Sequence, residues 1–115
     1  MSGVLKLEAA VLNWIRNKYN DSTLSCQIEA LVPSSHEYTV VGSYTHFTFP
    51  PSIAKLNTTF FPKRVIDGPY IKSPGIEYDG GSVLFTEDGY ITCLEIYANG
   101  NKFDENTEEF ELFDS

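Results

Sequence analysis

The chain has 115 residues, of which 42% are hydrophobic and 14% aromatic, and its formal net charge is −8. This length predicts a single domain, residues 1–115, around one core. Residues 1–73 carry seven basic and five acidic side chains, whereas residues 74–115 carry one basic and eleven acidic. Such a field repels phosphate, so the charge argues against direct nucleic-acid binding and favours encounter with a basic partner.

The first residues lack the apolar run of a secretory signal, and no stretch approaches the roughly 18 apolar residues that a membrane span needs. We therefore expect a cytoplasmic protein with no membrane association. In that compartment Cys26 and Cys93 are expected to be reduced thiols within the core.

Residues 4–18 have helical spacing. The residues on one stripe are Leu7, Val11, Trp14 and Ile15, and no Gly or Pro interrupts them. The sequence Asn20-Asp21-Ser22 offers a stop. This pattern predicts a helix that covers one face of a sheet.

Two β segments are expected next. Residues 23–32 alternate between apolar and polar, with Cys26 on the core side and Gln27 in water, which predicts a strand ending at a turn over residues 33–35. Residues 37–49 form a longer β run, and Gly42-Ser43 in its middle predicts a bulge or bend. His36 is expected in the solvated turn, and His46 as a hydrogen-bonded strand residue.

Residues 50–64 contain three prolines and two phenylalanines, and predict an irregular connection whose aromatic side chains tuck into the core. Residues 65–71, divided by Asp67-Gly68-Pro69, predict a broken edge strand or short hairpin. Turns are expected at residues 73–75 and 79–81. Alternation around Phe110 and Leu112 predicts a short last strand.

The strongest signal lies at residues 80–100. Two apolar segments flank Glu87-Asp88-Gly89, and Asp-Gly is a preferred pair for a tight hairpin turn. Both segments are apolar on both faces, which predicts interior strands of the sheet. Glu95 stands in an apolar row, so it needs a partner, and Arg16 or Arg64 could pair with it. Alternatively, Glu95 is a site residue with a shifted pKa.

No motif indicates a metal, a cofactor or a catalytic centre. The chain has no Cys-x-x-Cys or His-Glu-x-x-His, and Gly80-Gly81 leads into a strand rather than a helix. Cys93 and His46 could form a nucleophilic pair, but a thiol in an apolar strand is usually protonated and inert. We therefore expect a protein that is not an enzyme, with no cofactor and no bound metal.

The C-terminal half resembles a known group of small bacterial proteins. The resemblance rests on the segments Gly89-Tyr90-Ile91-Thr92-Cys93-Leu94-Glu95-Ile96-Tyr97 and Asp67-Gly68-Pro69-Tyr70-Ile71, and on the final Phe-Glu-Leu. Such proteins look similar to immunity proteins of polymorphic-toxin and contact-dependent growth-inhibition systems. The resemblance implies a cytoplasmic protein that neutralises a toxin domain, often a nuclease, by binding it.

These observations together predict an α+β fold, with one N-terminal helix packed on a mainly antiparallel sheet of about five or six strands. The predicted function is that of an immunity protein, monomeric, which masks the active site of a basic nuclease toxin with its acidic surface. The residues predicted to contact the toxin are Glu77, Asp79, Glu87, Asp88, Asp104, Glu105, Glu108 and Glu109.

Two alternatives stay open from the sequence. The first is a housekeeping enzyme or small-ligand binder with a pocket between helix and sheet near His46, Glu95 and Tyr97. The second is a scaffold or homodimer built through the aromatic segment 47–61, which gel filtration would detect.

Overall fold

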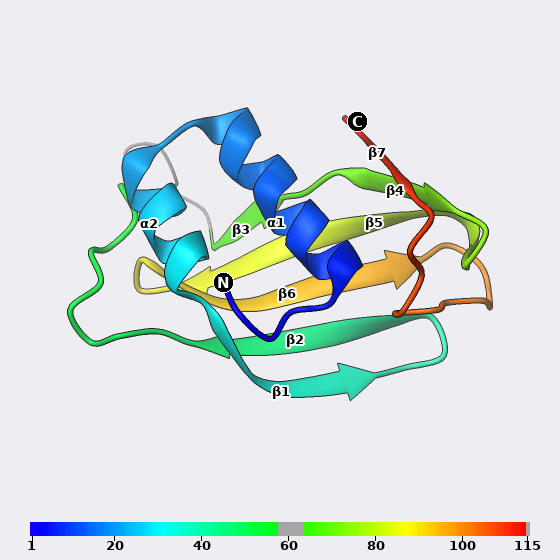
Figure 1. Ribbon diagram of the computed structural model, residues 1–115, viewed down its shortest axis with the longest axis horizontal. Coiled ribbons are helices and arrows are strands. Elements are labelled where there is room, and N and C mark those ends of the chain that lie inside the picture. Colours follow the sequence, from blue (N-terminus) through cyan, green and yellow to red (C-terminus); the bar gives the residue numbers. More distant parts are fainter. Residues whose placement is uncertain (58–63, 115) are drawn as a thin grey trace.

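The computed structural model describes residues 1–57 and 64–114. Two N-terminal helices, α1 (Lys6–Tyr19) and α2 (Ser22–Ala30), pack on one face of an antiparallel sheet (Figure 1). The α+β class is thus confirmed. The sheet comprises β1 (Val32–Tyr38), β2 (Gly42–Thr48), β3 (Val65–Asp67), β4 (Tyr70–Ser73), β5 (Ile76–Glu87), β6 (Tyr90–Ala98) and β7 (Glu111–Phe113).

The strand order is β1-β2-β6-β5-β4-β7, and β3 pairs with β5 beyond the end of β4. The prediction of interior strands for the hairpin is confirmed, because β5 and β6 lie in the middle of the sheet. Asp88 and Gly89 form its turn with positive φ angles of 52° and 85°. The broken strand at residues 65–71 is also found, divided between β3 and β4, and the short last strand is β7.

The predicted strand at residues 23–32 is wrong, because this segment is helix α2. Leu24 and Ile28 stand four residues apart, so they fit a helical stripe as well as a strand alternation. The deciding signal is Asp21, whose carboxylate caps the helix by accepting the backbone N–H of Leu24 at 3.0 Å. Asn20 ends α1 in the left-handed conformation, so one Asn-Asp pair both closes α1 and opens α2.

Three further expectations need correction. Residues 33–35 belong to strand β1 rather than to a turn. The β run expected over residues 37–49 is divided by a turn at residues 39–41, so Gly42-Ser43 begins β2 rather than forming a bulge or bend within one strand. Residues 79–81 lie inside β5. Gly80 and Gly81 are needed there because a side chain would collide with Tyr97, which lies alongside on β6. Of the irregular connection at 50–64, residues 58–63 lie outside the described residues.

The core lies between the helices and the sheet. Leu7, Val11 and Ile15 of α1 are fully buried against it, as the helical spacing predicts. Gln27 of α2 is buried as well, contrary to its expected place in water, whereas Cys26 is exposed rather than part of the core. The helices therefore cover one side of the sheet, and among the described residues no helix covers the other.

Candidate protein-binding surfaces

Six of the eight predicted contact residues gather at one end of the sheet. We call this set the acidic end, and its members are Glu77, Asp79, Asp104, Glu105, Glu108 and Glu109. They come from the start of β5 and from the segment between β6 and β7, which are far apart in the sequence. The segment folds back against the β4–β5 turn, where the backbone N–H of Asp104 donates to Gly75 at 2.8 Å and that of Glu77 to Lys102 at 3.0 Å.

Side-chain hydrogen bonds hold the acidic end in place. The Glu77 carboxylate accepts the backbone N–H of Asn101 at 2.9 Å, and the Asn99 amide donates to the carbonyl of Asp79. Ser73 donates to the carbonyl of Glu109 at 2.5 Å. These bonds fix parts of the backbone that carries the acids, which lowers the backbone entropy that is lost on binding.

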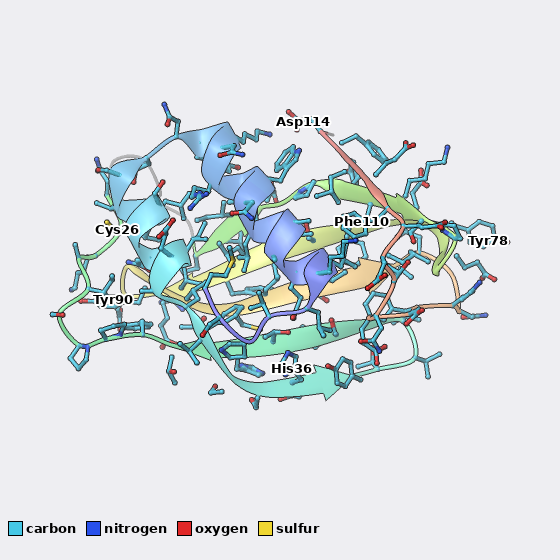
Figure 2. The ribbon with its side chains drawn as sticks, in the orientation of Figure 1. Cys26, His36, Tyr78, Tyr90, Phe110 and Asp114 are labelled. Carbon is cyan, nitrogen blue, oxygen red and sulfur yellow. The ribbon has the colours of Figure 1, made fainter. Side chains whose placement is uncertain are left out.

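Exposed apolar side chains lie beside the acidic end. Tyr38, Val40 and Val41 surround the β1–β2 turn, and Val40 is 75% exposed. The backbone N–H of Ala98 donates to the carbonyl of Val41 at 2.7 Å, which fastens this turn next to the segment that carries the acids. Tyr78, 73% exposed, projects from the same end of the molecule with a positive φ of 49° (Figure 2).

Two open grooves flank the acidic end. The larger, of about 620 Å³, is lined by Lys72, Pro74, Phe110 and the three glutamates at 108, 109 and 111, and the smaller, of about 430 Å³, lies on the side of Lys102 and Asp104. Lys102 donates to the carbonyl of Pro74 at 2.8 Å. The end of the sheet is therefore uneven and partly apolar, with exposed aromatic surface that suits a protein contact, and its acidic charge suits a basic partner.

Glu87 and Asp88, the other two predicted contact residues, lie at the opposite end of the sheet. They form the β5–β6 turn next to Tyr90, and Figure 2 shows Tyr90 and Tyr78 at opposite ends of the molecule. Asp79 and Glu87 are eight residues apart on one strand, a separation of roughly 26 Å at the usual rise per residue. Hence the eight acids do not form one continuous surface.

Glu95 points away from the helices. Its neighbours on β6, Leu94 and Ile96, are in the core, so the alternation of the strand places Glu95 on the opposite face. There it hydrogen-bonds with Tyr44 of β2, an interaction that raises the pKa of the tyrosine. The suggested pairing of Glu95 with Arg16 is not found, because Arg16 contacts Glu29 at 2.5 Å.

The pocket expected between helix and sheet near His46, Glu95 and Tyr97 is wrong for the same reason, since all three side chains lie on the face without helices. His46 and Cys93 are direct neighbours across β2 and β6. However, burial raises the pKa of the Cys93 thiol to about 11, with Glu95 adding to the rise. The Nε2 atom of His46 lies 3.2 Å from the carboxylate of Glu37. A thiol in this state is a poor nucleophile near neutral pH.

The buried polar cluster around Glu8 was not predicted from the sequence. Glu8 of α1 is only 2% exposed, and its carboxylate accepts the backbone N–H of Leu5 at 2.8 Å and the hydroxyl of Thr45. The Nε2 atom of His36 lies 3.6 Å from the same carboxylate, so His36 is a half-buried strand residue rather than a solvated turn residue. The helical stripe predicted for residues 4–18 left Glu8 unassigned, although a Glu at the third helical position commonly bonds back to the helix start.

Within residues 1–57 and 64–114, no group of three or more His, Cys, Asp or Glu side chains has an arrangement that could hold a metal ion. In the same residues, neither helix has the length and apolar character needed to cross a membrane. Comparisons of the chain with protein-family models, with curated proteins and with solved structures found no match.

Proposed function

We propose that this protein is a cytoplasmic immunity protein that neutralises a toxin domain by binding it through the acidic end. The observation that carries the proposal is the gathering of six carboxylates and several exposed apolar side chains at one end of the sheet, by segments distant in sequence. Carboxylates speed encounter with a basic surface, and aromatic side chains supply area that becomes buried. Tyr78, with its exposed ring, is the best placed anchor.

The partner proposed is a basic nuclease domain, because a nuclease that grips nucleic acid presents a cationic cleft. An acidic surface that occupies such a cleft excludes the substrate. Masking of this kind requires no chemistry from the inhibitor, so the protein acts as a binding partner and not as an enzyme. It acts as a monomer, since its acidic end would repel a second copy.

The test is calorimetric titration with the purified toxin domain encoded next to this gene. The variant Glu108→Gln/Glu109→Gln removes two charges from the acidic end, and Glu87→Gln/Asp88→Asn removes two from the opposite end as the matched control. Asn tolerates the positive φ of residue 88, so the control keeps its turn. We expect the first variant to raise Kd about tenfold, from two rim charges, and the control to change it less than threefold.

Two outcomes would contradict the proposal. One is the absence of a complex at low ionic strength, where charge attraction is strongest. The other is an equal loss of affinity in the two variants. It would mean that binding depends only on the total charge of the protein and not on the acidic end.

A further inference from the structure

The face of the sheet without helices has an ordered pattern of its own. One row of side chains crosses five strands in register, because Glu37 of β1 pairs with Tyr44, Tyr44 with Glu95, Glu95 with Val83, and Val83 with Asp67 of β3. Carboxylates therefore occupy every second strand, with an aromatic or aliphatic side chain between them. Since neighbouring strands lie roughly 4.8 Å apart, the carboxylates recur about every 10 Å.

An aromatic ring lies beside this row. Tyr97 pairs with Gly42 on one side and with Gly81 on the other, so no side chain flanks it on either neighbouring strand. Its ring leans over Gly81, because a Cβ added to that glycine would meet the Tyr97 hydroxyl at 2.3 Å. Tyr97 is half-buried, so part of its side chain remains exposed on this face.

On the same face, exposed aromatic and apolar side chains extend from Tyr97 towards β3, β4 and β7. Tyr70 and Phe113, paired across β4 and β7, have ring centroids 5.8 Å apart and are each nearly 40% exposed. Val65 is 40% exposed at the β3 edge. A stretch of exposed apolar side chains next to polar ones is the kind of surface that other proteins bind.

The charges on this face decide what kind of partner fits. Among the described residues of this face, Lys72 lies at the margin, opposite Glu111 across β4 and β7, and the Nε2 atom of His46 lies 3.2 Å from the carboxylate of Glu37. The interior of the face carries Glu95 next to Tyr44 and Tyr97. Two copies placed face to face would bring like carboxylates together, so a second copy is disfavoured.

We propose that the face without helices is a docking surface for a protein segment that presents arginine side chains about 10 Å apart. A guanidinium group stacks on an aromatic ring and at the same time donates to a carboxylate, whereas the ammonium of lysine is a more strongly hydrated point charge. The combination of Tyr97, Tyr44 and Glu95 offers both contacts. This surface is distinct from the acidic end, and the inference does not depend on the proposed function.

The experiment is a titration of the ¹⁵N-labelled protein, followed by NMR at low ionic strength, with the peptides (Arg-Gly)₅ and (Lys-Gly)₅. Their arginines or lysines are two residues apart, about 7 Å in an extended chain, and the long flexible side chains can spread to reach carboxylates about 10 Å apart. We expect the arginine peptide to shift the amide signals of Tyr44, Glu95 and Tyr97, and to do so at lower concentration than the lysine peptide. Equal shifts with both peptides, or shifts confined to the acidic end, would overturn the proposal.

Variants test whether the arginine peptide binds at the Tyr97 ring and the Glu95 carboxylate. Tyr97→Leu and Glu95→Gln are each expected to raise the apparent Kd of the arginine peptide about threefold, as for loss of one exposed cation–π or ionic contact. Tyr97→Phe keeps the ring, and Glu87→Gln removes a distant charge, so both should remain within about twofold of the parent protein. An unchanged Kd in Tyr97→Leu and Glu95→Gln would count against the assignment.

A dilution series of the protein alone tests whether a second copy of the chain binds this face. Signals of this face that move with protein concentration in the absence of peptide would identify self-association and overturn the proposal. The comparison of the two peptides uses the unmodified protein, so it holds even where a variant folds poorly. Failure here would leave toxin binding untouched, since that is measured on Glu108 and Glu109 at the other surface.

Discussion

At the scale of single residues, Gln27 is a buried side chain that links three parts of the fold, although the sequence predicted it to lie in water. Its amide nitrogen donates to the carbonyls of Ala54 and Gly89, both at 2.8 Å, and its amide oxygen accepts the backbone N–H of Ile91 at 2.9 Å. One side chain thus joins α2 to the loop after β2 and to the turn of the central hairpin. Because the residue is 1% exposed, water cannot replace these bonds.

We predict that Gln27→Ala lowers the free energy of unfolding by about 3 kcal/mol, from three buried hydrogen bonds at about 1 kcal/mol each. Urea denaturation followed by fluorescence measures it. Gln27→Glu should be strongly destabilised at pH 7, because a carboxylate cannot donate to the two carbonyls. Its burial would raise the folded-state pKa, so the stability should partly recover as the pH falls and the carboxyl becomes protonated. Insensitivity of Gln27→Glu to pH would contradict this account.

The two cysteines should differ in reactivity. Cys26 is exposed on α2, whereas Cys93 is buried and its thiol has a pKa of about 11. At pH 8 only about one Cys93 thiol in a thousand is ionised, and the thiolate is the reactive form. We expect Ellman's reagent to modify one thiol rapidly in the folded protein and the second only after unfolding. In Cys26→Ser the rapid phase should vanish, and its persistence would show that Cys93 is accessible.

At the scale of the elements, the junction between α1 and α2 is the decisive local feature. Asp21 accepts hydrogen bonds from the Thr23 hydroxyl and the Leu24 backbone N–H, and these bonds hold its pKa below the ordinary value of 3.8. The carboxylate therefore stabilises the fold above pH 3.8, and this contribution is lost as the pH falls through the lowered folded-state pKa.

We predict that Asp21→Ala lowers the free energy of unfolding by about 1 kcal/mol, the usual value of an N-cap. Asp21→Asn keeps an acceptor oxygen but loses the charge, so its stability at pH 7 should lie between those of the parent and Asp21→Ala. Thermal unfolding at pH 7 and at pH 3 measures both effects. The difference between the parent and Asp21→Ala should shrink at pH 3, and a difference that stayed constant would show that the charge of Asp21 is not involved.

The central hairpin is the element that the sequence predicted best. Its turn needs positive φ at two successive residues, and Asp-Gly meets that need without help from the rest of the chain. The first helix could be predicted equally well, because its apolar stripe is long enough to distinguish the spacing of a helix from the alternation of a strand. By contrast, α2 has only nine residues, over which both periods fit.

At the scale of the whole molecule, the charge distribution sets the behaviour expected of the proposed complex. The formal net charge is −8, and the acidic end carries six of the carboxylates. Association with a basic toxin domain should therefore be steered by long-range attraction. The acidic end and the face of the sheet without helices are different surfaces, so one molecule has room for two separate contacts.

We predict that the association rate with the toxin domain falls about tenfold between 0.05 and 0.5 M salt, approximate concentrations over which the Debye length contracts severalfold. Stopped-flow fluorescence measures this rate. The dependence on salt should be weaker for Glu108→Gln/Glu109→Gln than for the parent protein, while Glu87→Gln/Asp88→Asn should stay closer to the parent. An association rate that does not depend on salt would show that electrostatic steering does not contribute.

The sequence by itself determined the features that depend on neighbouring residues: the first helix, the hairpin turn, the interior position of its strands and the accumulation of acids after residue 74. It also indicated the eight acids as a group, but not that topology would separate Glu87 and Asp88 from the other six by the length of a strand. Only the tertiary structure decided this, because the acidic end is assembled by the return of the chain against the start of β5. The side of the sheet on which Glu95 lies was likewise settled only by packing, since alternation shows which residues share a face, while the position of the helices decides which face is covered.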